Sequence, residues 1–212
     1  MTNFDRSWDE LLAACQGCKA CPLAETRNHV VVWRGGLEKA KFIIIGEGPG
    51  AEEDAQGKPF VGRSGKLMDL MLQGLGFHDQ DYHIMNIVKC RPPKNRAPSP
   101  EEIKACRPLL ERQIGLVDCR FIVLCGATAF HAFTGRTEPI SKVRGQFINQ
   151  DGRLLMPTFH PAYLLRNGNM RGYFWDDFAK LKQKIADTEG YLQEEPPLVT
   201  QYRESQGHQE GL

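Results

Sequence analysis

The segment KFIIIGEG (Lys41–Gly48) decides the fold, because it runs a short apolar strand directly into a glycine turn. This strand lies near residues 41–47, and similar apolar runs rich in β-branched residues occur near 82–89, 121–125 and 154–159. Helical patterns separate the runs. Strand followed by helix, several times over, predicts a parallel sheet covered on both faces. We therefore expect a three-layer α/β/α sandwich with a central, mainly parallel four-stranded sheet.

Bulk properties fit one ordinary globular domain. The chain has 212 residues and a formal net charge of +1. Such a small net charge produces no strong positive electrostatic potential over the whole protein that would indicate a nucleic-acid partner. There is no signal-peptide core and no apolar run long enough to span a bilayer, which predicts a cytoplasmic protein without a membrane partner. An odd count of seven cysteines in that compartment argues against a disulfide framework. We predict one domain over residues 1–189 and a mobile tail over 190–212, where periodicity is lost.

Two helices have well-defined signals in the sequence. In SPEEIKACRPLL, Ser99 is the expected N-cap, Pro100 fits the first helical position and Glu102 completes a capping box. The stretch GRSGKLMDLMLQGLG predicts a second helix with one apolar stripe. Its members are Leu67, Leu70, Met71 and Leu75.

Residues that follow the strands are the candidates for a site, because open parallel sheets bind ligands beyond the carboxyl ends of their strands. The stretch GEGPGAEEDAQGKPFVG (Gly46–Gly62) follows the first strand. It has the outline of a phosphate cradle, but it carries carboxylates where phosphate needs cations, and it lacks the third glycine of a dinucleotide fingerprint. The glycines alone favour a tight turn with a solvated acidic flank. For Phe60, a core position is the commoner outcome, and stacking of the ring on a planar ligand is the alternative.

Four of the seven cysteines form two pairs that could meet at one metal centre. The pairs are Cys18 with Cys21, and Cys90 with Cys106. Cys15 offers a second register for the first pair, and we prefer Cys18 because Pro22 ends the turn after Cys21. Zinc and an iron–sulfur cluster both accept four thiolates, and the long spacing of the second pair favours iron–sulfur. The remaining Cys119 and Cys125 suit buried, unrelated thiols.

Taken together, five stretches resemble the type-4 uracil-DNA glycosylases, which are iron–sulfur members of the uracil-DNA glycosylase superfamily. The stretches are CKACPLAETRN, GEGPGAEEDAQGKPFVGRSGKLMD, NIVKCRPPKNRAPSPEEIKACRPLL, LCGATA and HPAYLLR. They extend from about Cys18 to the last helix. Their order and chemistry make the resemblance specific, although each stretch alone is a weak signal.

The resemblance implies a DNA-repair activity and assigns residues to it. A 4Fe-4S cluster would be held by Cys18, Cys21, Cys90 and Cys106. The uracil pocket would be formed by Glu47, Gly48, Glu53, Phe60, Asn86 and His160. Phe60 would stack on the base, Asn86 would read its edge and His160 would face its O2. The glycine turn then has a physical purpose, because it lets the backbone approach a neutral flat base closely.

The implied catalytic residues are His160, Glu47 and Asn86, and each has suitable chemistry. The Asn86 amide pairs with N3–H and O4 of uracil, whereas cytosine presents a reversed pattern. A donor at O2, expected of His160, stabilises the departing uracil anion. Either Glu47 or Glu53 would orient water or stabilise the sugar cation, and the sequence does not separate them.

DNA contacts are expected from three segments. Apolar wedges beside the site would come from AYLLR, with Leu164, Leu165 and Arg166, although these leucines suit a core-packed helix equally well. Phosphate contacts would come from KCRPPKNR and SKVRG, which also read as solvated basic loops. Their basic residues are Lys89, Arg91, Lys94, Arg96, Lys142 and Arg144.

A second class of function remains open, namely a non-catalytic iron–sulfur or zinc module that binds nucleic acid. Such a module would keep the cysteines and the basic loop but would not need Phe60, Asn86 and His160 together. A sister branch that links covalently to DNA through a loop histidine is disfavoured, because no histidine lies between Asn86 and Cys106. We expect a monomer that acts on single- or double-stranded uracil-containing DNA, with a structural role for the cluster. The sequence indicates no protein partner.

Overall fold

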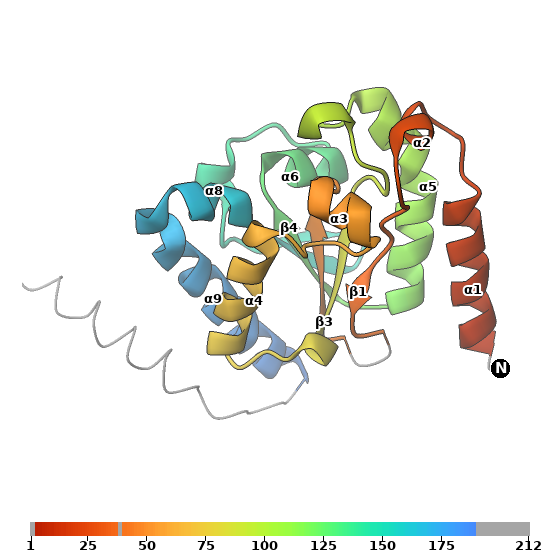
Figure 1. Ribbon diagram of the computed structural model, residues 1–212. Coiled ribbons are helices and arrows are strands. Elements are labelled where there is room, and N and C mark those ends of the chain that lie inside the picture. The colour runs from red at the N-terminus through yellow and green to blue at the C-terminus, as the bar shows by residue number, and fades with distance from the viewer. Residues whose placement is uncertain (1–2, 38–39, 190–212) are drawn as a thin grey trace, which may run out of the picture.

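A single mixed sheet of six strands lies at the centre of the computed structural model, which describes residues 3–37 and 40–189 (Figure 1). The strand order is β1-β3-β2-β4-β6-β5. The four inner strands are parallel, and β1 and β5 pair antiparallel at the two edges. The strands are β1 (Arg34–Gly35), β2 (Phe42–Gly46), β3 (Tyr82–Asn86), β4 (Phe121–Cys125), β5 (Ile148–Gln150) and β6 (Arg153–Thr158).

The four predicted strands are confirmed, and the predicted sheet size is corrected from four strands to six. The additional strands β1 and β5 span 2 and 3 residues, which is too short for an alternating pattern to be visible in the sequence. Strand β3 also ends earlier than predicted, at Asn86, where the chain turns into the basic loop.

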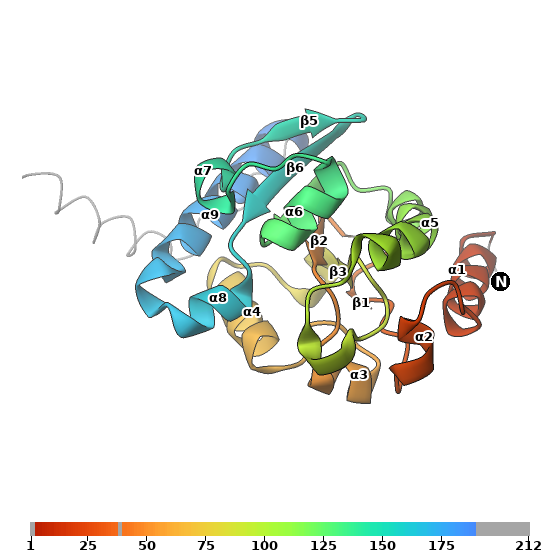
Figure 2. The same ribbon diagram turned by 90° about the horizontal axis from the view of Figure 1, so that it is seen from above.

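Helices cover both faces of the sheet, as Figures 1 and 2 show, which confirms the three-layer sandwich. The α-helices are α1 (Asn3–Gln16), α2 (Leu23–Thr26), α3 (Ala51–Gln56), α4 (Arg63–Gly74), α5 (Pro100–Val117), α6 (Ala127–Thr134), α7 (Ile140–Val143), α8 (Pro161–Arg166) and α9 (Arg171–Glu189). Three short 3-10 helices complete the described elements: η1 (Asp79–Asp81), η2 (Pro93–Asn95) and η3 (Gly168–Met170).

Alternate residues of the central strand face opposite layers. In β2, Ile43 and Ile45 join the core under α1, α5 and α6, whereas Phe42 and Ile44 join the core under α4, α8 and α9. All five residues of β2 are buried, as expected of a parallel strand with helices on both sides. Burying one such side chain contributes about 1.5–3 kcal/mol, so the sheet is a rigid base for the loops at its end.

The predicted start of α5 is confirmed. The Ser99 hydroxyl accepts the Glu102 N–H at 3.3 Å, and the Glu102 carboxylate accepts the Ser99 N–H at 2.7 Å. The predicted stripe of α4 is wrong at Leu70, whose side chain is 68% exposed. Met71 and Leu75 of the predicted stripe are buried, and Met68 and Leu72 face the core in place of Leu70, because the helix is apolar over so much of its circumference that the sequence does not fix the inward direction.

Residues 190–212, which the sequence predicts to be a mobile tail, lie outside the described residues. In the described part of the chain, every helix is too short or too polar to cross a bilayer.

Candidate active site

The carboxyl ends of the parallel strands open onto a cavity of about 480 Å³. Helices α3, α6 and α8, which follow three of these strands, lie together at this end of the sheet (Figure 1). The cavity is bordered by all the side chains and backbone groups predicted to contact uracil: Glu47, Gly48, Glu53, Phe60, Asn86 and His160. Segments far apart in the sequence therefore converge on one hollow.

The first glycine of the turn allows two of these side chains to meet. A Cβ atom on Gly46 would lie 2.5 Å from the Asn86 Oδ1 atom and 2.5 Å from the Phe60 Cζ atom. Real Cβ atoms do not approach other atoms so closely, so glycine at the end of β2 is required by packing. The absence of a side chain at Gly46 lets the Asn86 amide and the Phe60 ring lie side by side.

Two carboxylates of the turn bind backbone N–H groups. Glu53 Oε2 accepts the Gly50 N–H at 3.1 Å, and Glu53 Oε1 accepts the N–H groups of Val61 at 3.0 Å and Gly62 at 2.8 Å. The buried Asp54 carboxylate accepts the backbone N–H of Asn28 at 2.9 Å. These contacts explain why acidic residues occupy a turn that does not hold phosphate.

Glu47 differs from Glu53 because its carboxylate has no hydrogen-bond donor among the described residues, and it borders the cavity. A carboxylate without a protein partner is available to water or to a developing positive charge. The structure thus distinguishes two side chains that the sequence leaves equivalent.

The Asn86 side chain is 2% exposed at the carboxyl end of β3. Its backbone carbonyl accepts a hydrogen bond from the Lys89 ammonium at 3.0 Å. Its side-chain amide borders the cavity and has no protein hydrogen-bond partner in the described part of the chain. A buried amide with open donor and acceptor positions is suited to reading the edge of a base.

Phe60 has an uncommon backbone conformation, with φ 54° in the left-handed region. Such a conformation costs a bulky residue on the order of 1–3 kcal/mol, so the surroundings must hold it. The ring is 5% exposed and stacks against the His160 ring at 5.7 Å between centroids and an interplanar angle of 28°. Phe60 therefore has the core position that the sequence favours and also borders the cavity, while its stacking on a base stays a prediction.

His160 caps α8 and presents one defined tautomer. Its Nδ1 accepts the Ala162 N–H at 3.1 Å, so in the neutral ring the proton is on Nε2. Burial, together with the charge of Arg166, lowers the pKa of His160 to about 4, against a smaller opposing effect of Glu53. The ring is a neutral N–H donor at pH 7.

The predicted apolar wedge is contradicted at Leu164, whose side chain is fully buried in the core under α4 and α9. Leu165 is half-buried and Arg166 is exposed, and Arg166 also borders the cavity. Of the three predicted residues, Leu165 and Arg166 therefore keep surface that is exposed to solvent.

The predicted phosphate contacts divide into paired and available cations. Lys89 is 1% exposed, which contradicts a DNA contact. Arg144 is committed to the buried Asp177 carboxylate, with Nε to Oδ2 at 3.0 Å, and its guanidinium lies 4.6 Å from the centre of the Tyr173 ring. Arg96 is paired with Glu102 at 2.6 Å but stays 46% exposed.

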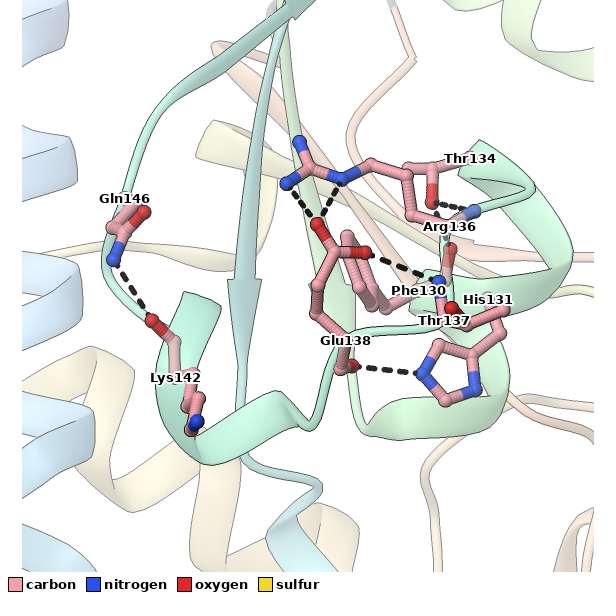
Figure 3. A network of polar contacts seen from close by, with 8 residues as sticks. All are labelled: Phe130, His131, Thr134, Arg136, Thr137, Glu138, Lys142 and Gln146. Atoms are coloured by element: carbon pink, nitrogen blue, oxygen red, sulfur yellow. Dashed lines mark hydrogen bonds and ion pairs between the residues drawn. The ribbon is translucent and has the colours of Figure 1, made fainter.

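Available charges remain on two loops. In KCRPPKNR, Lys94 is exposed, and the partly exposed Arg91 donates to the Asn95 side chain at 2.8 Å. In SKVRG, Lys142 is exposed, and its side chain points away from the neighbouring polar network (Figure 3). Within that network the Arg136 guanidinium is paired with the Glu138 carboxylate (Figure 3). Of the two cations, Lys142 is therefore the one whose charge can bind a phosphate.

The four predicted cluster ligands come from the α1–α2 connection, the loop after β3 and α5. Burial raises the pKa of the Cys90 thiol, and the charges of Cys21 and Cys18 raise it further. The Arg27 guanidinium, which donates to the Cys90 sulfur at 3.1 Å, lowers the same pKa in part. Burial raises the pKa of Cys106 as well, with a contribution from Cys90 and Cys21. These four thiols therefore lie in one neighbourhood, to which Cys15 also belongs, because its pKa responds to Cys106, Cys18 and Cys90.

Among the side chains that the structure describes, no three of His, Cys, Asp or Glu are arranged to hold a single metal ion. A polynuclear cluster is wider than one ion, so its thiolates stand further apart. The Lys89 ammonium provides a test of fit: it is fully buried, its hydrogen-bond acceptor is a carbonyl, and the ionisable groups near it are the thiols of Cys106 and Cys15, whose pKa is raised by burial and which stay protonated in the absence of metal. A buried cation requires a neighbouring anion, and metal-bound thiolates would supply it.

Comparison with known proteins agrees with this geometry. Residues 33–182 match the family model described as uracil DNA glycosylase superfamily. A type-4 uracil-DNA glycosylase of Thermotoga maritima is 46% identical over 172 residues, which cover 79% of this chain and 89% of that protein. The chain belongs to the uracil-DNA glycosylase superfamily.

Within the superfamily, the relatives place the chain with the type-4 group. A type-4 uracil-DNA glycosylase of Saccharolobus solfataricus is 38% identical over 195 residues, covering 88% of each chain. A type-5 uracil-DNA glycosylase of Thermus thermophilus is 30% identical over 146 residues, covering 54% of this chain and 66% of that protein.

The glycosylase site also contains residues that the sequence did not single out. Ser64, in the first turn of α4, and Asn95, in η2, border the cavity. Asn95 and its neighbour Lys94 both have φ 55°, an irregular backbone that no local pattern predicts. The resemblance covers the surrounding stretches, but a small polar residue such as Ser64 has no signal of its own.

Proposed function

We infer that this protein removes uracil from DNA by hydrolysing the N-glycosidic bond, releasing free uracil and leaving an abasic site. One observation carries the inference. A buried amide, an aromatic ring and a neutral imidazole donor border the same cavity at the ligand-binding end of the sheet. Relatives named type-4 uracil-DNA glycosylases, similar over most of the chain, support it.

Recognition of uracil follows from the Asn86 amide. The amide oxygen accepts the uracil N3–H, and the amide NH₂ donates to O4. Cytosine would place an acceptor against the oxygen and a donor against the NH₂, leaving buried polar groups unpaired. Such a mismatch typically costs a factor of about 10⁴ or more in specificity.

Catalysis is proposed to rest on His160. As the bond between C1′ of the sugar and N1 of uracil breaks, the bonding electron pair leaves with the base, and negative charge gathers on O2. The Nε2–H group of neutral His160 donates to that oxygen, and the hydrogen bond strengthens as the charge develops. Water then adds to C1′, and its proton is lost to solvent or to the departed base, which completes the hydrolysis.

Glu47 is the carboxylate proposed to face the sugar. Its side chain borders the cavity without a protein donor among the described residues, whereas Glu53 is engaged by three backbone N–H groups. Glu47 can orient the water or stabilise the positive sugar, and Glu53 holds the wall of the pocket.

We propose that Cys18, Cys21, Cys90 and Cys106 hold a 4Fe-4S cluster, with the buried Lys89 ammonium as the internal cation beside it. Bound there, the cluster would cross-link the α1–α2 connection to α5 and to the basic loop. This role is structural, because the chemistry of base removal needs no electron transfer.

Access to a base inside a duplex requires that the base leave the stack. Leu165 and Arg166 of α8 keep exposed surface beside the cavity and are proposed to enter the opened stack, and Lys94 and Lys142 are exposed cations suited to phosphates. A monomer in the cytoplasm, acting on single- or double-stranded uracil-containing DNA, remains the prediction from sequence.

The decisive experiment incubates the protein with oligonucleotides that contain one uracil, single- and double-stranded, and then cleaves abasic sites with alkali. Release of free uracil and strand cleavage at the uracil position are expected, with no cleavage when thymine or cytosine replaces it. Tight binding without uracil release would favour the non-catalytic module. Iron and sulfide analysis of the same sample tests the cofactor independently.

A further inference from the structure

The Phe60 turn is held from a direction that the uracil pocket does not explain. Arg34, in the edge strand β1, donates from Nε to the Pro59 carbonyl at 2.8 Å and from Nη2 to the Phe60 carbonyl at 3.2 Å. The same Nη2 donates to the Asp69 carboxylate of α4 at 2.6 Å. One guanidinium thus binds both peptide carbonyls at the left-handed residue.

The opposite side of the turn is fixed by Glu53, which accepts the N–H groups of Val61 and Gly62. The carbonyls before the turn and the N–H groups after it therefore all have partners from elsewhere in the fold. Space for this backbone is provided by Gly65, where a Cβ would lie 1.8 Å from the Phe60 carbonyl oxygen. The left-handed conformation is set by surrounding groups, because a phenylalanine has no local preference for it.

Arg34 and Asp69 differ from Glu53 in one decisive respect. Glu53 borders the cavity, whereas neither Arg34 nor Asp69 is among the described residues that border it. Their side chains are 16% and 27% exposed, and Arg34 contacts this wall of the cavity through the carbonyls of Pro59 and Phe60. Any effect of this pair on a base in the cavity must pass through Phe60.

We propose that the Arg34–Asp69 pair positions Phe60 for stacking on uracil, which rests on the proposed function. Arg34 fixes the two carbonyls that set the direction of the ring, and Asp69 fixes the guanidinium. The planar fork of arginine is required, because a lysine ammonium cannot reach both carbonyls and the carboxylate in one geometry. Arg34 and Asp69 are positioning residues and do not contact the substrate.

The test measures single-turnover release of uracil with enzyme in excess over a uracil-containing oligonucleotide. Arg34→Ala is expected to slow release about 10- to 100-fold, since small displacements of a positioning group have effects of this size. Arg34→Lys and Asp69→Asn should also slow it, and the Kd for DNA should change less than about threefold, because neither residue borders the cavity. Arg107→Ala is the matched control: Arg107 also binds a carboxylate, Glu111 at 2.7 Å, and a carbonyl, but far from Phe60.

A double-mutant cycle with Phe60→Ala separates positioning from general destabilisation. If Arg34 acts through the ring, Arg34→Ala should slow release less than about threefold further once the ring is absent. An equal loss in both backgrounds, or wild-type rates for Arg34→Ala, overturns the proposal. Should Arg34→Ala fail to fold, the same double-mutant cycle is measured with Arg34→Lys or Asp69→Asn, each combined with Phe60→Ala. A wild-type protein that releases no uracil would instead overturn the proposed function.

Discussion

At the scale of single residues, the site shows how surroundings give identical side chains different roles. Glu47 and Glu53 belong to the same turn. Glu53 is saturated by backbone donors, while Glu47 borders the cavity without one among the described residues. The donors of Glu53 include the loop that carries Phe60, so this difference depends on tertiary structure and is not visible in the sequence.

Substitution by glutamine should separate the two carboxylates. Glu53→Gln replaces an acceptor-only group with one that presents N–H to backbone N–H, so the free energy of unfolding should fall by about 1–3 kcal/mol. Glu47→Gln should leave stability within about 0.5 kcal/mol and slow uracil release. Urea titration and single-turnover assays measure the two effects. A reversed pattern would exchange the assigned roles.

His160→Ala should reduce the single-turnover rate about 100- to 1000-fold, the usual effect of removing one donor from a developing oxyanion. DNA affinity should be nearly unchanged, which a binding titration with uncleavable DNA would check. Unchanged rates would remove His160 from the mechanism.

The pH dependence of the rate follows from the same ring. Burial lowers the pKa of His160 to about 4, so the neutral donor is fully present well above that value and is lost as the pH falls through 4. The rate should therefore show no inflection from this group near the ordinary histidine pKa of about 6.5. An inflection there that disappears in His160→Gln would show that the ring titrates normally.

At the scale of elements, a substitution at Gly46, the last residue of β2, tests whether the pocket depends on close packing at this point. Gly46→Ala would place a methyl group 2.5 Å from both Asn86 and Phe60, so the pocket must distort. We expect a rate at least about 100-fold lower. Gly115→Ala is the matched control, because a Cβ there meets nothing within 4 Å and lies in α5. It should raise stability by about 0.5–1 kcal/mol and leave activity unchanged.

The sequence predicts the inner strands because each is a continuous apolar run between turn signals. It misses β1 and β5, whose pairing is set by their neighbours. It predicts the residues that border the cavity through the resemblance, but not Arg34, which lies in an unpredicted strand and acts at long range. Leu164 shows the same limit, since an exposed wedge and a buried helix residue have the same local pattern.

Helix α8 and the basic loops should carry the salt dependence of DNA binding. Replacing exposed Arg166 or Lys94 by alanine should reduce the slope of log K against log salt by about 1 for each phosphate that is no longer neutralised. Arg136→Ala should leave the slope unchanged, because Glu138 already pairs with that charge. Slopes identical to wild type for both Arg166→Ala and Lys94→Ala would place the DNA elsewhere.

At the scale of the whole molecule, the proposed cluster would join the N-terminal segment to α5 and to the loop beside the cavity, because its four cysteines come from these three segments. Cys106→Ser should lower the iron content and reduce the unfolding temperature by about 5–10 °C, as expected for a loss of roughly 2–3 kcal/mol in a domain of this size. Cys119→Ser is the control, because its thiol donates to the Ala40 carbonyl at 2.8 Å and a hydroxyl can do the same. A Cys106→Ser protein with full iron content would contradict the ligand assignment.

The placement of His160 directly after β6 has a consequence for synthesis. β6 joins the sheet by pairing with β4, so the imidazole reaches the cavity after the strands that carry the glycine turn and Asn86 have been made. A nascent or prematurely terminated chain would hold the groups proposed to read the base without the imidazole proposed to donate to its O2. A chain that stops before β6 would therefore bind the base without being equipped to release it.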